Sequence, residues 1–326
     1  MTTRRYAKVI GTGSYLPEKT LTNADLEKMV DTTDEWITQR SGIKERHIAA
    51  YSETTGDMAI AAAKRAMEAA NVSPEDIDAI IIATTTPDRT FPAVAVKVQG
   101  ELGIPPCMAF DVQAVCTGFV YALSTVDSFI RSGQVKRALV IGAEKMSSIV
   151  DWDDRATCVL FADGAGAVVL ESHEAEENLE AQGFHSTHLY ANGAQRELLQ
   201  TSGGVSSTGD RGTIEMQGRE VFKYAVSYMA DVVKEVLEVN NLTADQIDWL
   251  VPHQANIRII HGTADKLDMP YDKVVITVDR HGNTSAASIP LALDEAVRDG
   301  RIQRGQLCLI EAMGGGLTWG AALLRY

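Results

Sequence analysis

The sequence predicts an α/β protein of two halves related by a pseudo-twofold axis, with mixed, mainly parallel sheets. Asn71–Pro87 and Asn241–Asn256 share one layout, a helix end and a short helical turn before a buried strand, at an offset of 170 residues. Ser132–Glu144 and Asp299–Gly314 share a second layout at an offset of 167 residues. Long helical patterns precede short continuous apolar runs, which are typical of strands buried on both faces. These observations together predict two stacked α/β halves.

The first half, residues 1–172, contains clear helix and strand patterns. A long helix is expected over Asp57–Ala70, and the apolar run Ala79–Thr84 follows it as a buried strand. A second helix begins close to Cys116, and the run Ala138–Ala143 forms the next strand. Cys116 is therefore placed where an apolar run ends and a helix begins.

The second half, residues 173–326, repeats this order. The helix Val221–Val239 precedes a strand over Trp249–Pro252, and Asn283 stands just before a further helix. The segment between the halves, residues 171–212, is polar and rich in Gly, Ser and Glu. It predicts an irregular connection with some strand, and it places the boundary near residue 173.

Composition limits the class of protein. The chain has 326 residues, 45% of them hydrophobic, and a net charge of −14. This charge argues against nucleic acid as a partner. No window approaches the roughly 18 apolar residues of a membrane span, so we expect a cytoplasmic protein that does not enter a membrane. The four cysteines are dispersed and form no CxxC pair, and no group of metal ligands stands out.

Cys116 has two interpretations, a small buried hydrophobe or a nucleophile. At a helix N-terminus, backbone amides and the helix dipole would lower its pKa from about 8.5. At an offset of 167, Cys116 superposes on Asn283, and at an offset of 170, His253 falls on Ala83 at a strand end. Functional groups of open α/β sheets gather at the carboxyl ends of strands. The repeat therefore makes it plausible that Cys116, His253 and Asn283 share one cleft.

Each of the other candidates also has a structural interpretation. His253 can be a hydrogen-bonded structural residue, and Asn283 can be a helix cap. The glycines 314–316 can form a flexible turn, or they can let the backbone approach a ligand and direct an N–H at a developing oxyanion. The residue types alone leave these alternatives open.

Four motifs, DVQAVCTGF, HQAN, GNTSAASIP and GGGLTWG, stand in this order along the chain. Together with IGTGSYLPE, TTDEWITQRSGIKERHIA and the C-terminal WGAALLRY, they closely resemble the β-ketoacyl-acyl carrier protein synthase III family of the thiolase superfamily. The resemblance covers nearly the whole chain. It implies a five-layer αβαβα thiolase fold, a homodimer, and a function in starting type II fatty acid synthesis.

The resemblance also implies a mechanism. Cys116 would take the acyl group from an acyl-CoA primer, and the backbone N–H groups of Cys116 and Gly315 would form the oxyanion hole. His253 and Asn283 would then donate hydrogen bonds to the enolate formed when malonyl-acyl carrier protein loses CO₂. Acyl-CoA is a substrate here, and no further cofactor or metal is expected.

Binding roles follow from the same resemblance. Trp36 and Arg155 would sandwich the CoA adenine, with Arg40 near the nucleotide or its phosphates. Asn256 would bond the pantetheine arm. Phe91 would cross the dimer interface and close the acyl pocket of the partner.

A basic patch for the acidic carrier protein would centre on Arg258, with Lys223 and Lys266 as weaker neighbours. Such a patch is required by the overall charge of −14, because an acidic partner meets a repulsive field elsewhere. The alternative for these three residues is an ordinary solvated helix face.

Three residues depart from the usual family pattern. Val115 and Thr117 flank the cysteine where alanines are usual, and Met313 stands where many members have Phe. They leave open which primer is accepted, and they allow a CoA-dependent condensing enzyme of secondary metabolism, of quinolone or polyketide type. An acyl-thioester hydrolase or plain acyltransferase is a further alternative, disfavoured because such an enzyme needs no decarboxylation pair.

Overall fold

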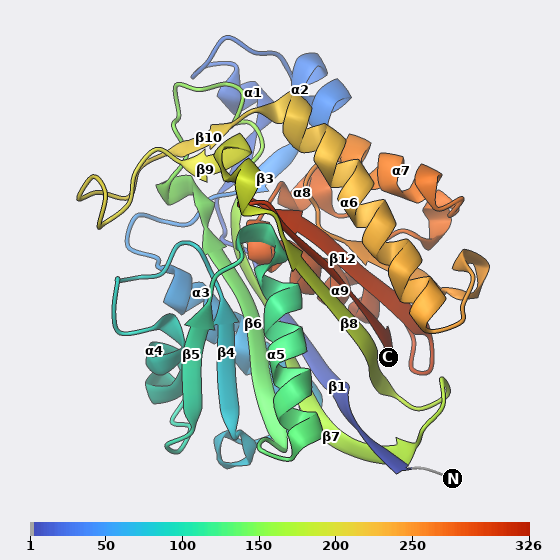
Figure 1. Cartoon of the computed structure of the whole chain (residues 1–326). Helices are drawn as coiled ribbons and strands as arrows, with labels where there is room; N and C mark the ends of the chain where they lie inside the picture. Colours follow the sequence, from blue (N-terminus) through green and yellow to red (C-terminus); the bar gives the residue numbers. More distant parts are fainter. Residues whose placement is uncertain (1–2) are drawn as a thin grey trace.

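The structure, a computed structural model, describes residues 3–326. One sheet has five strands in the order β1–β7–β6–β4–β5 (Figure 1). They are β1 (Thr3–Tyr15), β4 (Ala79–Ala83), β5 (Met108–Val112), β6 (Arg137–Lys145) and β7 (Asp163–Glu176). Strand β4 pairs in parallel with β5 and β6, whereas β7 is antiparallel to both β1 and β6.

The second sheet has four strands in the order β11–β12–β13–β8. They are β8 (Gly183–Ala191), β11 (Trp249–Pro252), β12 (Leu307–Gly314) and β13 (Thr318–Arg325). Only β11 and β12 are parallel here. Within residues 3–326, three pairings of the two sheets are parallel and four are antiparallel. Both sheets are mixed, as predicted. The prediction that they are mainly parallel is wrong, because every pairing made by β1, β7, β8 and β13 is antiparallel.

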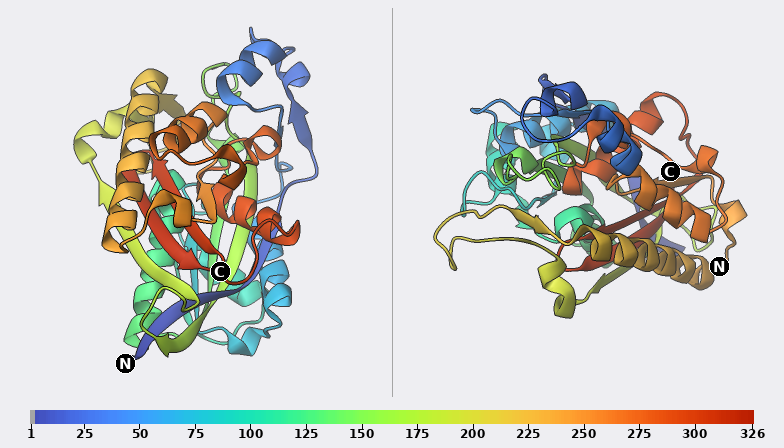
Figure 2. Two further views of the ribbon diagram at one scale, coloured as in Figure 1. Left: turned by 90° about the vertical axis from the view of Figure 1, so that its right-hand side faces the viewer. Right: turned by 90° about the horizontal axis from the view of Figure 1, so that it is seen from above.

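Helices cover the sheets on three levels. Helices α5 (Gly118–Ser132) and α9 (Ser288–Arg298) share one core with β1, β4 and β12, so they lie between the two sheets. Helices α3 (Thr55–Ala70) and α4 (Val94–Glu101) pack on the other face of the first sheet. Helices α6 (Gly218–Val239) and α7 (Ile257–Lys266) lie on the outer side of the second sheet (Figures 1 and 2).

The remaining elements are short. A small substructure near the N-terminus extends from the first sheet and consists of β2, α1, α2 and β3 (Figure 2). In it, α2 contacts α7 and β3 contacts α8. Strands β9 and β10 form a separate two-stranded sheet. Their bounds are β2 (Thr20–Thr22), α1 (Asn23–Leu26), α2 (Asp34–Ser41), β3 (Glu45–His47), β9 (Leu199–Thr201), β10 (Ile214–Met216) and α8 (Val278–His281).

The internal repeat is visible in the backbone. The 3₁₀ turn before β4 and the 3₁₀ turn before β11 both follow an asparagine at φ 53°, Asn71 in one copy and Asn241 in the other. The 3₁₀ turns that precede α5 and α9 also begin at equivalent positions, Val115 and Ser285, each at φ 50°. The boundary expected near residue 173 falls inside β7, and the connection to β8 is short.

Candidate active site

Cys116 lies in the 3₁₀ turn Val115–Thr117 that leads into α5, and it is buried. The turn packs against β12 and against the matching turn before α9. A side chain at Gly314 would stand 2.7 Å from the Cys116 backbone nitrogen, which explains why glycine occupies that position. The glycine segment and the cysteine turn therefore support each other directly.

The equivalence drawn from sequence between Cys116 and Asn283 is wrong by three residues. Because the two 3₁₀ turns begin at Val115 and Ser285, the counterpart of Cys116 is Ala286. The offset of 167 arises because α9 has 11 residues against 15 in α5, and Asp299 adds one residue before Gly300, whereas Gly133 directly follows α5, which leaves a net difference of three. Asn283 still lies at the same end of the sheet, just before the turn.

His253 follows β11, and its backbone N–H donates to the Glu311 carbonyl at 2.8 Å. Its ring Nδ1 lies 2.7 Å from the Ser288 hydroxyl, which also accepts the Gln254 backbone N–H. The Ser288 proton is therefore available to Nδ1, and Nε2 then carries the ring hydrogen. Burial lowers the pKa of His253 to about 3, so the ring is neutral. The site gains a neutral N–H donor.

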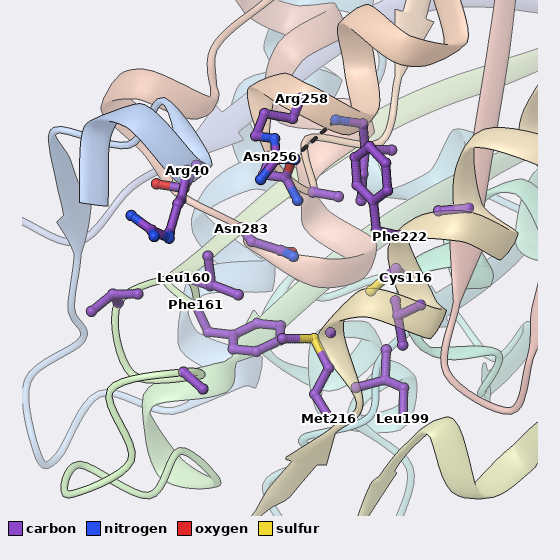
Figure 3. Close-up of a pocket in the computed structure, with 18 of the residues that line it drawn as sticks. Arg40, Cys116, Leu160, Phe161, Leu199, Met216, Phe222, Asn256, Arg258 and Asn283 are labelled. Carbon is purple, nitrogen blue, oxygen red and sulfur yellow. Dashed lines mark hydrogen bonds between the residues drawn. The ribbon is translucent and has the colours of Figure 1, made fainter. Parts of the chain in front are cut away.

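The position of Asn283 is fixed by backbone and side-chain bonds. Its N–H donates to Leu160 and its carbonyl accepts from Ala162, both at 2.9 Å. Its side-chain Oδ1 accepts the Ser285 N–H at 2.9 Å, which leaves Nδ2 as a donor. Figure 3 shows the Asn283 amide directed toward the side of the pocket that holds Cys116. The amide oxygen therefore stabilises the start of the turn before α9, while Nδ2 stays available as a donor to the cavity.

Cys116, His253 and Asn283 line one cavity of about 380 Å³. Figure 3 shows Cys116 and Asn283 in it. Met313 lines this cavity too and is not among the residues of the second cavity described below. The three candidate groups come from different elements and meet because the two halves pack face to face. Their meeting is a finding of the structure; the role of each remains a proposal.

Trp36 lines this cavity together with Arg40. The guanidinium groups of Arg40 and Arg155 lie 4.5 and 5.0 Å from its indole centroid. Arg155 also donates to the Asp31 carbonyl, which holds it over the indole. Asn256 lines the cavity and caps α7 by accepting the Ile259 N–H at 3.0 Å. An aromatic ring that stacks between Trp36 and Arg155 would have to move the Arg155 guanidinium away from the Trp36 indole.

A second cavity, of about 1080 Å³, opens on the other side of the cysteine. Cys116, Val115 and Gly315 line it together with Thr85 and Leu199. Thr117 is buried beneath it and donates to the Thr318 carbonyl, so its hydroxyl faces the protein. Val115 thus reaches this cavity, whereas Thr117 does not.

Phe91 lies outside both cavities and is 82% exposed, on the segment before α4. Of the three basic residues expected to contact the carrier protein, Arg258 lines the first cavity, and its guanidinium lies 5.2 Å from the Phe222 ring centroid. Lys223 pairs with Glu220 on α6, and Lys266 donates to Ser227. The three lie on the neighbouring helices α6 and α7.

The predicted lowering of the Cys116 pKa is wrong. Burial raises the pKa of this thiol to about 12; a hydrogen bond with Ser285 lowers it, and the charge of Glu144 raises it. Removal from water thus outweighs the amides of the helix N-terminus. The sequence analysis assigned no functional role to Ser285, a possible helix cap, or to Glu144, although a Glu directly after the apolar run Ala138–Ala143 is a detectable signal.

Gln254 explains the second residue of the HQAN motif. Its side chain donates to the carbonyls of Pro252 and Val275 and accepts the N–H groups of Thr277 and Val278. All four of its hydrogen-bonding sites are thereby used. Gln254 fixes the loop that carries His253 and does not face a ligand.

Within residues 3–326, no helix is long and apolar enough to cross a bilayer.

Comparisons with known proteins match both halves of the chain. Residues 110–193 match the family model described as 3-oxoacyl-[acyl-carrier-protein] synthase III, and residues 237–326 match the model of its C-terminal part. A beta-ketoacyl-[acyl-carrier-protein] synthase III of Paramagnetospirillum magneticum is 60% identical over 319 residues, 98% of each chain. One of Thioalkalivibrio sulfidiphilus is 61% identical over 326 residues, covering 98% of this chain and 99% of the relative.

Two solved structures share the fold closely. The 3-oxoacyl-[acyl-carrier-protein] synthase III of Aquifex aeolicus VF5 superposes with a TM-score of 0.92 at 53% identity, covering 98% of this chain and all of the other. The priming beta-ketosynthase of the R1128 polyketide pathway also reaches 0.92, at 35% identity, covering 98% and 96%. The likeness extends over the whole length of both chains.

Proposed function

Because the chain belongs to the 3-oxoacyl-[acyl-carrier-protein] synthase III family, we propose that Cys116, His253 and Asn283 are the residues that perform its reaction. As a member, it is an acyltransferase that condenses an acyl-CoA primer with malonyl-acyl carrier protein and so initiates fatty acid synthesis. The products are 3-oxoacyl-acyl carrier protein, CoA and CO₂. The shared cavity that joins the three residues carries this assignment.

In the first half-reaction, the Cys116 thiolate attacks the thioester of the primer and CoA leaves. The backbone N–H groups of Cys116 and Gly315 hold the tetrahedral oxyanion. The close approach of Gly314 to the cysteine turn supports this role, because it keeps the glycine segment beside Cys116. Trp36, Arg40, Arg155 and Asn256 bind the CoA, and the second cavity beside Val115 takes the acyl chain.

In the second half-reaction, malonyl-acyl carrier protein loses CO₂ and negative charge develops on its thioester oxygen. His253 Nε2 and Asn283 Nδ2 donate to that oxygen, each worth about 3–4 kcal/mol by analogy with oxyanion-hole donors. The carbanion attacks the acyl group on Cys116. The hydrogen bonds from Ser288 to His253 and from Ser285 to Asn283 support these roles, since both orient a donor toward the cavity.

The assembly is also part of the proposal. The chain adopts the five-layer thiolase arrangement and acts as a cytoplasmic homodimer, in which Phe91 closes the acyl pocket of the partner. The exposure of this aromatic ring, on the segment between β4 and α4, supports such an interface. Arg258, Lys223 and Lys266 receive the acidic carrier protein. Val115 and Met313 contribute to primer choice.

A second candidate is a priming condensing enzyme of a polyketide pathway. The TM-score of 0.92 to the R1128 priming ketosynthase favours keeping it, although the fatty acid relatives are far more similar in sequence. The two differ in which acyl acceptor the enzyme uses. A hydrolase is disfavoured, because the buried His253 and Asn283 donors serve a decarboxylation that hydrolysis does not need.

One experiment tests the proposal. The protein is incubated with a panel of acyl-CoAs, the added mass is located by peptide mapping, and malonyl-acyl carrier protein is then supplied. We expect the acyl group on Cys116 and a 3-oxoacyl product. An acyl group elsewhere, or release of free acid without condensation, contradicts the proposal. Acceptance of only a non-fatty-acid carrier protein favours the second candidate.

A further inference from the structure

Arg46 is a fully buried arginine of β3 that no step of the mechanism above uses. Its Nη1 donates to the Leu21 carbonyl at 3.3 Å and to Asn23 Oδ1 at 2.8 Å. Its Nη2 donates to the Val159 carbonyl at 2.5 Å. Burial lowers the pKa of Arg46 to about 10, so the group is still charged at neutral pH. Because all three acceptors are uncharged, the burial of this cation is costly and calls for a reason.

Through Nη2, Arg46 holds the segment that carries Arg155. The residue that accepts this bond, Val159, directly follows a tight turn in which the Asp154 carbonyl accepts the Cys158 N–H at 2.9 Å. Arg155 lies inside this hydrogen-bonded turn. A bond that fixes Val159 therefore also restricts where the backbone of Arg155 can lie.

Through Nη1 and Asn23, Arg46 also holds the helix that carries Trp36. Asn23 is buried, and its Nδ2 donates to Asp34 Oδ1 at 2.7 Å and to the Ile43 carbonyl at 2.8 Å. The first acceptor is the first residue of α2, and the second stands two residues beyond its end. Asn23 thus binds both ends of α2, with Trp36 between them, while its Oδ1 accepts the bond from Arg46.

The backbone and stem of Arg46 are fixed as well. Its strand pairs with β2, where Arg46 lies opposite Leu21. A side chain at Gly282 would place its Cβ 3.1 Å from Arg46 Cβ and 3.0 Å from Ala162 Cβ, so the absence of a side chain lets this loop pack directly on the arginine. The guanidinium is therefore held at a defined position between the two segments that it binds.

We propose that Arg46 is a positioning residue that sets the separation of Trp36 and Arg155, and thereby the affinity for the nucleotide of an acyl-CoA primer. This inference rests on the proposed binding of CoA by those two side chains. Arg46 lines neither cavity, so it acts through Asn23 on one side and through Val159 on the other. The Arg155 guanidinium lies 5.0 Å from the Trp36 indole centroid, and an adenine that enters between them needs both backbones at a defined distance.

A guanidinium suits this position because its two terminal nitrogens can bind two segments at once. Nη1 and Nη2 direct their donors outward from one rigid plane, whereas the ammonium group of lysine carries all of its donors on a single atom. A lysine at position 46 would keep the charge but could not bind Asn23 and Val159 with the same geometry. Arg46→Lys therefore removes the bridge between the two segments without removing the cation.

The test compares two primers, one with a nucleotide and one without. Acylation of Cys116 is measured with an acyl-CoA and with the matching acyl-pantetheine, which carries the same thioester but has no adenine to place beside Trp36. In Arg46→Lys, we expect kcat/KM for acyl-CoA to fall about tenfold, mainly through KM, and kcat/KM for acyl-pantetheine to change by less than about twofold. Asn23→Ala, which breaks the link from Arg46 to α2, should show the same selectivity.

Two further measurements separate positioning from general support of the fold. Arg304→Lys is the matched control, because Arg304 also donates to two backbone carbonyls, those of Val9 and Ile10, but lines neither cavity; it should change neither kcat/KM. In a double-mutant cycle, Arg46→Lys should have no further effect on acyl-CoA once Trp36→Ala is present, because the side chain through which it acts is gone.

Each result decides the matter. An equal loss for both primers means that Arg46 only supports the fold, and it overturns the proposal, as does an unchanged kcat/KM for acyl-CoA. A full effect of Arg46→Lys in the Trp36→Ala background also overturns it. If Arg46→Lys does not fold, Asn23→Ala gives the same decision. If Trp36→Ala alone leaves kcat/KM for acyl-CoA unchanged, the proposed CoA site fails and this inference fails with it, whereas an acyl group on a residue other than Cys116 identifies a failure of the proposed nucleophile.

Discussion

Replacing Asn283 by Ala should separate the two half-reactions. The change removes the Nδ2 donor from the cavity, while the backbone bonds of residue 283 to Leu160 and Ala162 still hold the loop. Loss of one donor to a developing oxyanion costs about 3–4 kcal/mol, so we expect decarboxylation and condensation to fall by a factor of about 10²–10³. Acylation of Cys116 should change by less than about threefold, because Asn283 has no part in that step.

The structure also sets the stability cost of this variant. The Ser285 N–H loses its acceptor in a buried position, which is worth about 1–3 kcal/mol. Asn178 offers a matched control, since its side chain accepts the Glu180 N–H in the same way, but it is exposed and lines neither cavity. Asn178→Ala should leave both half-reactions unchanged.

The assay follows acyl-enzyme by intact mass and CO₂ release from labelled malonyl-acyl carrier protein, with thermal unfolding as the check on folding. Equal losses in acylation and decarboxylation would refute the reasoning, because a residue that acts only in the second step cannot slow the first. A loss of condensation below about tenfold would also refute it, since that is less than one oxyanion donor supplies.

Three further predictions concern other parts of the site. Gly314→Ala should slow acylation of Cys116 by more than about tenfold, because its Cβ would stand 2.7 Å from the cysteine nitrogen. Gly193→Ala, which has open space around the new methyl group, should leave the acylation rate unchanged. Stopped-flow measurement of acylation tests both variants. Arg258→Glu should raise the KM for malonyl-acyl carrier protein roughly tenfold and weaken its salt dependence, and an unchanged KM would argue against the carrier-protein role. Because His253 has a folded pKa of about 3 and an unfolded pKa of about 6.5, its contribution to stability is complete above the unfolded value and is lost as the pH falls from there toward 3. Urea unfolding of His253→Gln should show a shallower acid loss than wild type, and an identical loss would contradict the neutral, buried histidine.

Much of the architecture could be predicted from the sequence, for a physical reason. Strands such as Ala79–Ala83 are apolar on both faces, and α3 begins at a threonine cap and ends before an asparagine, so both are recognisable locally. The repeat located the candidate groups near one another. It misaligned Cys116 with Asn283 because α9 is shorter than α5, and helix length is set by packing between the sheets.

Other features lay beyond sequence reasoning. The antiparallel pairing of β8 with β13 joins segments more than a hundred residues apart, and nothing local specifies it. The Cys116 pKa moved opposite to the prediction because the helix N-terminus is visible in a sequence, whereas the depth of burial is not. Likewise, Glu144 and Ser285 come from different halves, so only the folded chain brings them together.

The geometry of the site depends on contact between the two facing turns that begin at Val115 and Ser285. Each turn belongs to one copy of the repeat, and each is held by the other. If the interface between the two halves loosens, the Cys116 sulfur separates from His253 and Asn283 before any helix or strand has to unfold. Enzymatic activity should therefore be lost at lower denaturant concentrations than the circular-dichroism signal of the helices and strands. A ligand that binds across the interface between the two halves should make the two denaturation curves coincide again.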